Sequence, residues 1–227
     1  MAVLAPDGSS LSVEGAKERF LGAWAFMFWV SGQSSRIRMH TGNAGSLEAT
    51  EEAVGQLDQY RIRRARHGGA ELIAMEMADP ALTTFVWKGQ HHELTTTMGG
   101  VDVPFEAFLD VLSRLDLVDS SEGLQVRPRA GSGMDLTLTL GVNTLADVCA
   151  VTVKPLEPTR RLLPSHAGRR VRGGTMWHEA DSYGGVPVRR ALIAGRTTVT
   201  TLETRRPDDA RFVDVVENLA VDLVPAR

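Results

Sequence analysis

Two short segments of the sequence combine imidazole and carboxylate side chains, the groups that proteins use as general acids, general bases and metal ligands. Residues 91–93 read His-His-Glu, and residues 178–181 read His-Glu-x-Asp. Adjacent residues of a strand point to opposite faces, so the two histidines of the first segment cannot bind one metal ion together. The second segment lacks the His-Glu-x-x-His spacing of a helical zinc site. We therefore expect no metal site and no cofactor.

The catalytic candidates are acidic and imidazole side chains at corresponding places in the two halves of the chain. Asp79 follows Glu76 by three residues, and Asp181 follows Glu179 by two. Carboxylates that face each other would form an acid pair, and His178 could transfer a proton beside them. An aspartate that caps a turn explains the same pattern without catalysis, so both interpretations stay open.

No nucleophile is indicated by the sequence. Cys149, the only cysteine, lies in an apolar, strand-like segment, where a thiol is usually inert. Residues 31–35 lack the Gly-x-Ser-x-Gly pattern of hydrolases, and the Gly-Ser-Gly at 131–133 precedes a strand instead of a helix. A single cysteine permits no disulfide within the chain, which favours a reducing compartment.

Four aromatic residues lie close together in a chain that is only 6% aromatic. On an alternating strand Trp24, Phe26 and Phe28 share one face, and Trp29 lies on the other. The simpler interpretation is a buried core with one partly exposed aromatic side chain. The alternative is an apolar surface that binds a partner, with these four residues as its contacts.

The composition is that of a globular protein. Among 227 residues, 43% are hydrophobic and 23% are charged, and the net charge of -3 gives no basic surface for nucleic acid. Only three of the 25 basic residues are lysine, which is typical of a high-GC bacterial gene. Residues 1–11 lack a secretion signal, and the apolar run 21–30 is too short to cross a bilayer. We expect a cytoplasmic protein without nucleic-acid or membrane partners.

The strongest signal is an internal repeat. Leu-Glu-x-Thr occurs at 47–50 and again at 156–159, and Arg-x-Arg occurs at 61–63 and 170–172, both at an offset of 109 residues. Further matches have offsets of 105 to 107: the glycine pairs at 68–69 and 173–174, the hairpins at 85–97 and 191–201, and the apolar positions Phe105, Phe108, Leu109, Leu112 and Phe212, Val215, Val216, Leu219. Because all matches keep the same order, they favour a tandem duplication.

Hydrophobic period and turn residues predict the same elements in both copies: two strands, a short helix, four strands and a final amphipathic helix. In the first copy we expect helices at 47–57 and 104–115; in the second, prolines interrupt the first helix and the last covers 212–219. The predicted fold class is α+β, with two tandem-duplicated halves of antiparallel strands that each end in an amphipathic helix and are pseudo-twofold related.

The predicted organisation is an N-terminal segment at 1–22, a first repeat at 23–116, a linker at 117–130 and a second repeat at 131–227. The repeats either share one continuous sheet or pack face to face, since both arrangements cover apolar strand faces. A seam between similar halves is a common place for a groove.

The duplicated β-rich halves, each with a glycine turn, a strand and a helix at 89–115 and 195–219, resemble the EspG family of type VII (ESX) secretion chaperones. That family is cytosolic, comes from high-GC actinobacteria and has a quasi-twofold α/β architecture. The resemblance lies in architecture and composition; the family's long helices are not evident here, and no residue roles are carried over. It implies a chaperone that binds a pair of helical substrates.

Two functions follow from these observations. The first is a non-enzymatic cytoplasmic adaptor or chaperone that binds a protein partner through a groove or sheet edge between the duplicated halves. The alternative is a small-molecule enzyme or ligand-binding protein with a site between the halves that uses groups such as Asp79, His178 and Glu179. The sequence leaves homodimerisation open. Converging acids and imidazoles in an enclosed cavity would favour the alternative, and a shallow groove would favour the adaptor.

Overall fold

The computed structural model describes residues 1–17, 19–32, 36–45, 60–77, 81–183, 186–206 and 208–226. The chain divides into two compact units. The first unit comprises Leu4–Gly8 and Ala25–Leu138; the second comprises Met1–Val3, Ser9–Trp24 and Thr139–Arg227. Each unit is built mainly of antiparallel strands with few helices, so the predicted α+β class is confirmed in this broad sense.

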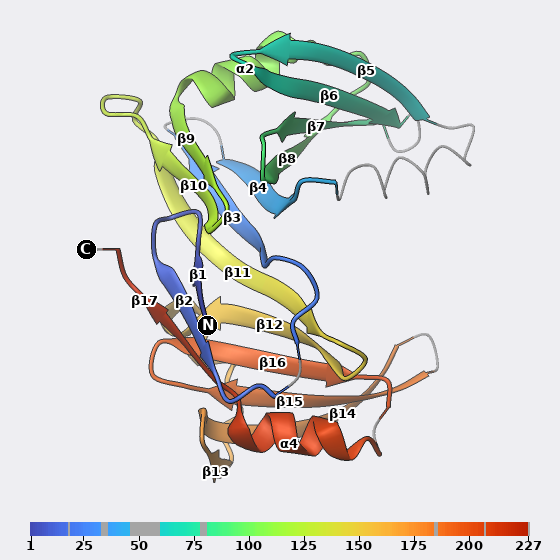
Figure 1. Cartoon of the computed structure of the whole chain (residues 1–227), viewed down its shortest axis with the longest axis vertical. Helices are drawn as coiled ribbons and strands as arrows, with labels where there is room; N and C mark the ends of the chain where they lie inside the picture. Colours follow the sequence, from blue (N-terminus) through green and yellow to red (C-terminus); the bar gives the residue numbers. More distant parts are fainter. Residues whose placement is uncertain are drawn as a thin grey trace. The chain divides into compact units, whose positions relative to one another are not determined.

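The sheet of the first unit has the strand order β3-β4-β8-β7-β6-β5, and all neighbours in it are antiparallel. A hairpin of β9 and β10 follows the helix α2 (Figure 1). The elements are β3 (Ala25–Ser31), β4 (Arg36–Asn43), β5 (Tyr60–His67), β6 (Ala70–Met77), β7 (Leu82–Lys88), β8 (His92–Gly99), α2 (Phe105–Ser113), β9 (Leu115–Ser120) and β10 (Gly123–Pro128).

The sheet of the second unit has the order β13-β14-β15-β16-β12-β11. A separate three-stranded sheet has the order β1-β2-β17. The elements are β1 (Ala2–Leu4), β2 (Ser10–Glu14), β11 (Asp135–Leu145), β12 (Cys149–Pro155), α3 (Leu156–Thr159), the 3-10 helix η1 (Arg160–Leu162), β13 (Arg169–Val171), β14 (Gly174–Tyr183), β15 (Val186–Ala194), β16 (Thr198–Thr204), α4 (Ala210–Asn218) and β17 (Ala220–Val224).

The main sheet of each unit has six strands. When these strands are numbered in sequence order within their own unit, both sheets have the order first, second, sixth, fifth, fourth, third. In each unit a helix follows the sixth strand, and another strand follows that helix. The two long hairpins also turn alike, because the N–H of Gly89 donates to the carbonyl of His92 and the N–H of Gly195 donates to that of Thr198, both at 2.9 Å. This turn gives a common reference point from which residues of the two sheets can be compared.

The terminal helices differ from the expected register. The residues buried in α2 and just after it are Phe108, Val111, Leu112 and Leu115, and those of α4 are Phe212, Val215, Val216 and Leu219. Both sets have the spacing i, i+3, i+4, i+7 of one helix face, but they correspond at an offset of 104 instead of 107. The predicted match began at Phe105, which is only half-buried, so it was wrong by one turn.

The expected linker at 117–130 forms most of the β9–β10 hairpin, because Leu124 and Val126 bury their side chains within the first unit. The predicted helix at 47–57 lies outside the described residues. In the second unit the prolines limit the corresponding helix to the four residues of α3, as expected.

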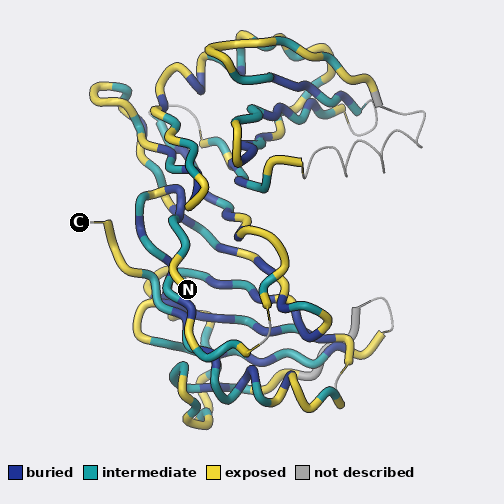
Figure 2. Tube along the Cα trace, viewed as in Figure 1, coloured by how far each residue is buried: buried dark blue, intermediate teal, exposed yellow. Residues whose placement is uncertain are grey.

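Buried residues lie mainly on the central strands of each sheet, and exposed residues lie mainly at turns and sheet edges (Figure 2). In the first unit the fully buried ring of Phe85 stacks on Phe108 of α2, with ring centroids 5.2 Å apart. In the second unit Phe212 of α4 is fully buried beside Arg189, whose guanidinium carbon lies 5.6 Å from the ring centroid. Each helix therefore covers one face of its own sheet.

We predict that Phe212→Ala lowers the free energy of unfolding by about 3–5 kcal/mol, because it leaves a cavity under α4. Val213→Ala is the matched control, since the Val213 side chain is exposed, and it should change stability by less than about 0.5 kcal/mol. Urea denaturation followed by circular dichroism measures both. Equal losses for the two variants would contradict the placement of α4.

Candidate binding surface

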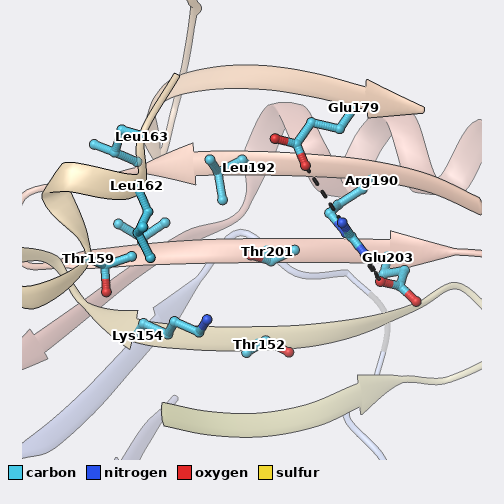
Figure 3. A pocket seen from close by; sticks show the side chains of 11 residues that line it. Thr152, Lys154, Thr159, Leu162, Leu163, Glu179, Arg190, Leu192, Thr201 and Glu203 are labelled. Carbon is cyan, nitrogen blue, oxygen red and sulfur yellow. Dashed lines mark hydrogen bonds and ion pairs between the residues drawn. The ribbon is translucent and has the colours of Figure 1, made fainter. Parts of the chain in front are cut away.

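The face of the second sheet that lies opposite α4 carries the candidate site. Arg189 contacts Phe212, so residues of β15 with the same parity, such as Ala191, face α4. Leu192 and Arg190 therefore point to the other face, which we call the open face (Figure 3). It is formed by side chains of β12, β16, β15 and β14, namely Thr152, Lys154, Val199, Thr201, Glu203, Arg190, Leu192, Trp177 and Glu179.

Antiparallel pairing arranges the open face in three rows that cross the strands. The charged row is Glu203–Arg190–Glu179, the middle row is Thr152–Thr201–Leu192–Trp177, and the third row is Lys154–Val199–Ala194–Thr175. Successive rows are two residues apart along each strand, which corresponds to about 6.6 Å. Register therefore places on one surface a charged end and a middle row of two threonines, a leucine and a tryptophan.

In the charged row an arginine lies between two carboxylates. Nη2 of Arg190 lies 2.9 Å from Oε2 of Glu203, and Nη1 lies 3.7 Å from Oε2 of Glu179. The side chains of Glu203 and Glu179 remain 41% and 44% exposed, so water or a partner can still reach them. One positive and two negative charges give this end of the surface a net charge of about -1.

The segment α3–η1 forms a wall at the other end of the open face. It is held to the sheet where the N–H of Leu156 donates to the carbonyl of Thr197 at 2.8 Å. From this wall Thr159, Leu162 and Leu163 border a depression of about 340 Å³ whose floor is the sheet (Figure 3). Leu162 is 67% exposed. A large apolar side chain therefore projects beside the polar floor.

Lys154 differs from the other charged groups of the open face. It is half-buried in the depression, and its ammonium group forms no ion pair or hydrogen bond with any described residue. The hydroxyls of Thr152, Thr159 and Thr201 likewise make no hydrogen bond within the described part of the chain. The depression thus offers one positive charge and three hydroxyls to a ligand.

The predicted catalytic residues do not converge. Glu179 lines the depression, but His178 precedes it on β14 and so points to the α4 side. Asp79 and the side chain of Asp181 lie outside the described parts of the structure. Glu76, the remaining carboxylate of the expected pair, is buried and accepts a hydrogen bond from Nε of Arg63 at 2.6 Å. That contact holds β5 to β6, which is a structural role.

Three of the four predicted partner-binding aromatics are core residues. Trp24, Phe26 and Phe28 are 3%, 4% and 0% exposed, so they present no surface to a partner. Trp29 is half-buried on the other face of β3, with the guanidinium carbon of Arg36 4.4 Å from its ring centroid. Strand alternation predicted these faces correctly, but it does not tell which face the fold covers.

The structure contains a histidine–aspartate pair that the sequence did not predict. Nδ1 of His92 lies 2.8 Å from Oδ1 of Asp119, and the N–H of His91 donates to Oδ2 at 2.8 Å. A Cβ atom at Gly89 would overlap Asp119, which explains glycine in this turn. No sequence pattern joins residues 27 positions apart on β8 and β9. The pair connects these strands within the first unit, and no described nucleophile completes a catalytic triad.

Comparisons with protein-family models, curated proteins and solved structures find no match for the chain. Within the described residues, no group of three or more His, Cys, Asp or Glu side chains is placed to hold a metal ion. None of the described helices is long and apolar enough to span a membrane.

We predict that His178 titrates below the ordinary imidazole value. Desolvation and the positive charges of Arg189 and Arg169 lower its pKa from 6.5, and Glu217 opposes them weakly. Arg189→Gln should raise the His178 pKa, whereas Arg196→Gln, which removes a more distant exposed arginine, should leave it unchanged. An NMR titration of the imidazole protons measures both; equal shifts in the two variants would contradict the assignment.

We also predict a pH-dependent contribution from Asp119. Burial opposes its ionisation, but hydrogen bonds from His91 and His92 prevail and lower its pKa below 3.8. The carboxylate therefore stabilises the fold above pH 3.8, and this contribution is lost as the pH falls through the lower pKa of the folded state. Asp119→Asn should cost about 1.5–3 kcal/mol at pH 7 and progressively less in acid.

Urea denaturation between pH 2.5 and 7 tests this dependence. Asp116→Asn is the control, because Asp116 is 58% exposed in a surface pair with Arg129 and should contribute little at any pH. A stability difference for Asp119→Asn that stays constant over the whole range would contradict the prediction.

Proposed function

We propose that this protein is a non-enzymatic cytoplasmic adaptor or chaperone, and that a protein partner docks on the open face of the second unit. We further propose that the two units arose by tandem duplication. The shared strand order, the matching hairpin turns and the corresponding buried helix faces support this origin. The pseudo-twofold relation and the resemblance to EspG-like chaperones stay predictions.

The observation that carries the proposal is a difference between equivalent rows of the two sheets. Counted from the Gly89 and Gly195 turns, Val86 and Ile73 in the first unit occupy the places of Leu192 and Trp177 in the second. Val86 and Ile73 are 1% and 0% exposed, so that face is covered.

In the second unit Leu192 and Trp177 are only half-buried, and Trp177 is partly covered by residues 166–168, where its Nε1–H donates to the carbonyl of His166 at 2.9 Å. Covering these side chains would remove apolar surface from water, at about 25 cal/mol per Å². A partner that covers the open face would therefore bury Leu192 and Trp177, as Val86 and Ile73 are already buried in the first unit. His178 points away from Glu179, so the acid and the imidazole that the sequence offered as catalytic candidates do not lie together on this face.

The experiment is site-specific photocrosslinking in the native host. A photoreactive phenylalanine analogue replaces Leu162, which projects beside the open face, or Val213, which is exposed on α4, as the matched control. We expect one crosslinked protein from position 162 that is absent from position 213. Purified, this protein should bind the full chain, and Leu162→Ser should weaken binding at least tenfold while Val213→Ser should not.

Two outcomes would overturn the proposal. One is the absence of any protein crosslink at position 162, and the other is the same products from both positions. A crosslink to a second copy of this chain would replace the adaptor by a homodimer. A small molecule that copurifies and fills the depression would favour the ligand-binding alternative instead.

A further inference from the structure

We infer that the partner segment is extended and carries three side chains on one face in the order acidic, apolar, basic, each two residues apart. This inference rests on the proposed function and assigns the chemistry of the same surface. The acidic group pairs with Lys154, the apolar group packs on the middle row, and the basic group meets Glu203 and Glu179.

The acidic side chain of the partner segment is inferred from the positive charge of Lys154, which has no described partner. The side chain of Lys154 is half-buried in the depression, and its ammonium group forms no ion pair or hydrogen bond with any described residue, so its positive charge stays uncompensated on this surface. A carboxylate from a partner would compensate this charge, and the neighbouring hydroxyls of Thr152 and Thr159 could donate to its second oxygen. Figure 3 shows Lys154 on the floor of the depression, between the α3–η1 wall and Thr152.

The basic side chain of the partner segment is inferred from the net negative charge of the charged row. Arg190 compensates only one of the two negative charges of Glu203 and Glu179. Both carboxylates are more than 40% exposed, so a lysine or arginine can approach from above the sheet. A partner with the opposite polarity would place its acid against these carboxylates and its base against Lys154, which like-charge repulsion disfavours.

The spacing follows from the register. Lys154 lies in the third row and Glu203 in the charged row, four residues apart along the strand direction, or about 13 Å. In an extended partner aligned with these strands, residues i, i+2 and i+4 face the sheet across the same distance. The middle residue then lies over Thr201 and Leu192, where an apolar side chain buries Leu192 and contacts Leu162.

The test uses a phage-displayed library of random dodecapeptides selected on the full chain, with the Lys154→Glu chain as the counter-selection. We expect enriched peptides with the pattern Asp/Glu-x-apolar-x-Lys/Arg, in either chain direction. Lys154→Glu should weaken binding of a synthetic peptide of this pattern at least tenfold. Lys17→Glu is the control, since Lys17 is 73% exposed and pairs with Asp214 away from the depression.

A charge exchange separates this pairing from misfolding. Replacing the peptide's acidic residue by lysine should abolish binding to the natural chain and restore it to the Lys154→Glu chain. The chain has only three lysines, so NMR of ¹³C-methylated lysine should show a shift of the Lys154 signal on peptide binding, with Lys17 and Lys88 unmoved.

Absence of enrichment, enriched peptides without an acid, or equal binding to the Lys154→Glu chain would overturn the inference. These results are distinguishable from failure of the proposed function. A partner that crosslinks at position 162 but binds the Lys154→Glu chain with the same affinity as the natural chain contradicts only the inference. Selected peptides of the expected pattern, together with no crosslinked protein at position 162, defeat the adaptor proposal.

Discussion

An antiparallel sheet with apolar residues on both faces must have both faces covered, and among the described residues each unit has one nine-residue helix, α2 or α4, that covers one face. α2 and α4 cover corresponding faces, as the contacts of Phe108 with Phe85 and of Phe212 with Arg189 show. On the opposite faces the units differ. Ile73 and Val86 are buried in the first unit, whereas Leu192 and Trp177 are only half-buried in the second. The candidate site depends on this difference.

Cross-strand register brings side chains of four separate strands together on the open face. Arg190 lies opposite both Glu203 and Glu179, so a single guanidinium contacts two carboxylates on neighbouring strands and compensates one of their two charges. The short α3–η1 segment, limited by its prolines, leaves most of the face accessible while its leucines border one end. A longer helix in this place would have covered the middle row. These prolines thus also shape the depression.

Much of the fold could be predicted from the sequence, because strand period, glycine turns and helix periodicity are local signals. The hairpins at Gly89 and Gly195 and the helices beginning near residues 105 and 210 are examples. Burial was predicted only as one of two interpretations: alternation placed Phe26 and Phe28 on one face, and tertiary packing makes that face the core and not a partner-binding surface. The site was largely missed, since of its residues only Glu179 carried a signal, and the His92–Asp119 contact joins distant positions.

The basic residues of the open face suit different tasks. Arg190 has a planar fork of donors, which can contact Glu203 and Glu179 on both sides while lying along the sheet. Lys154 is one of only three lysines among 25 basic residues, and its ammonium is a compact charge on a flexible stem. Such a group adapts to a single carboxylate that arrives from solution. In the proposed complex, Arg190 therefore organises the surface before binding, and the carboxylate of the partner contacts Lys154.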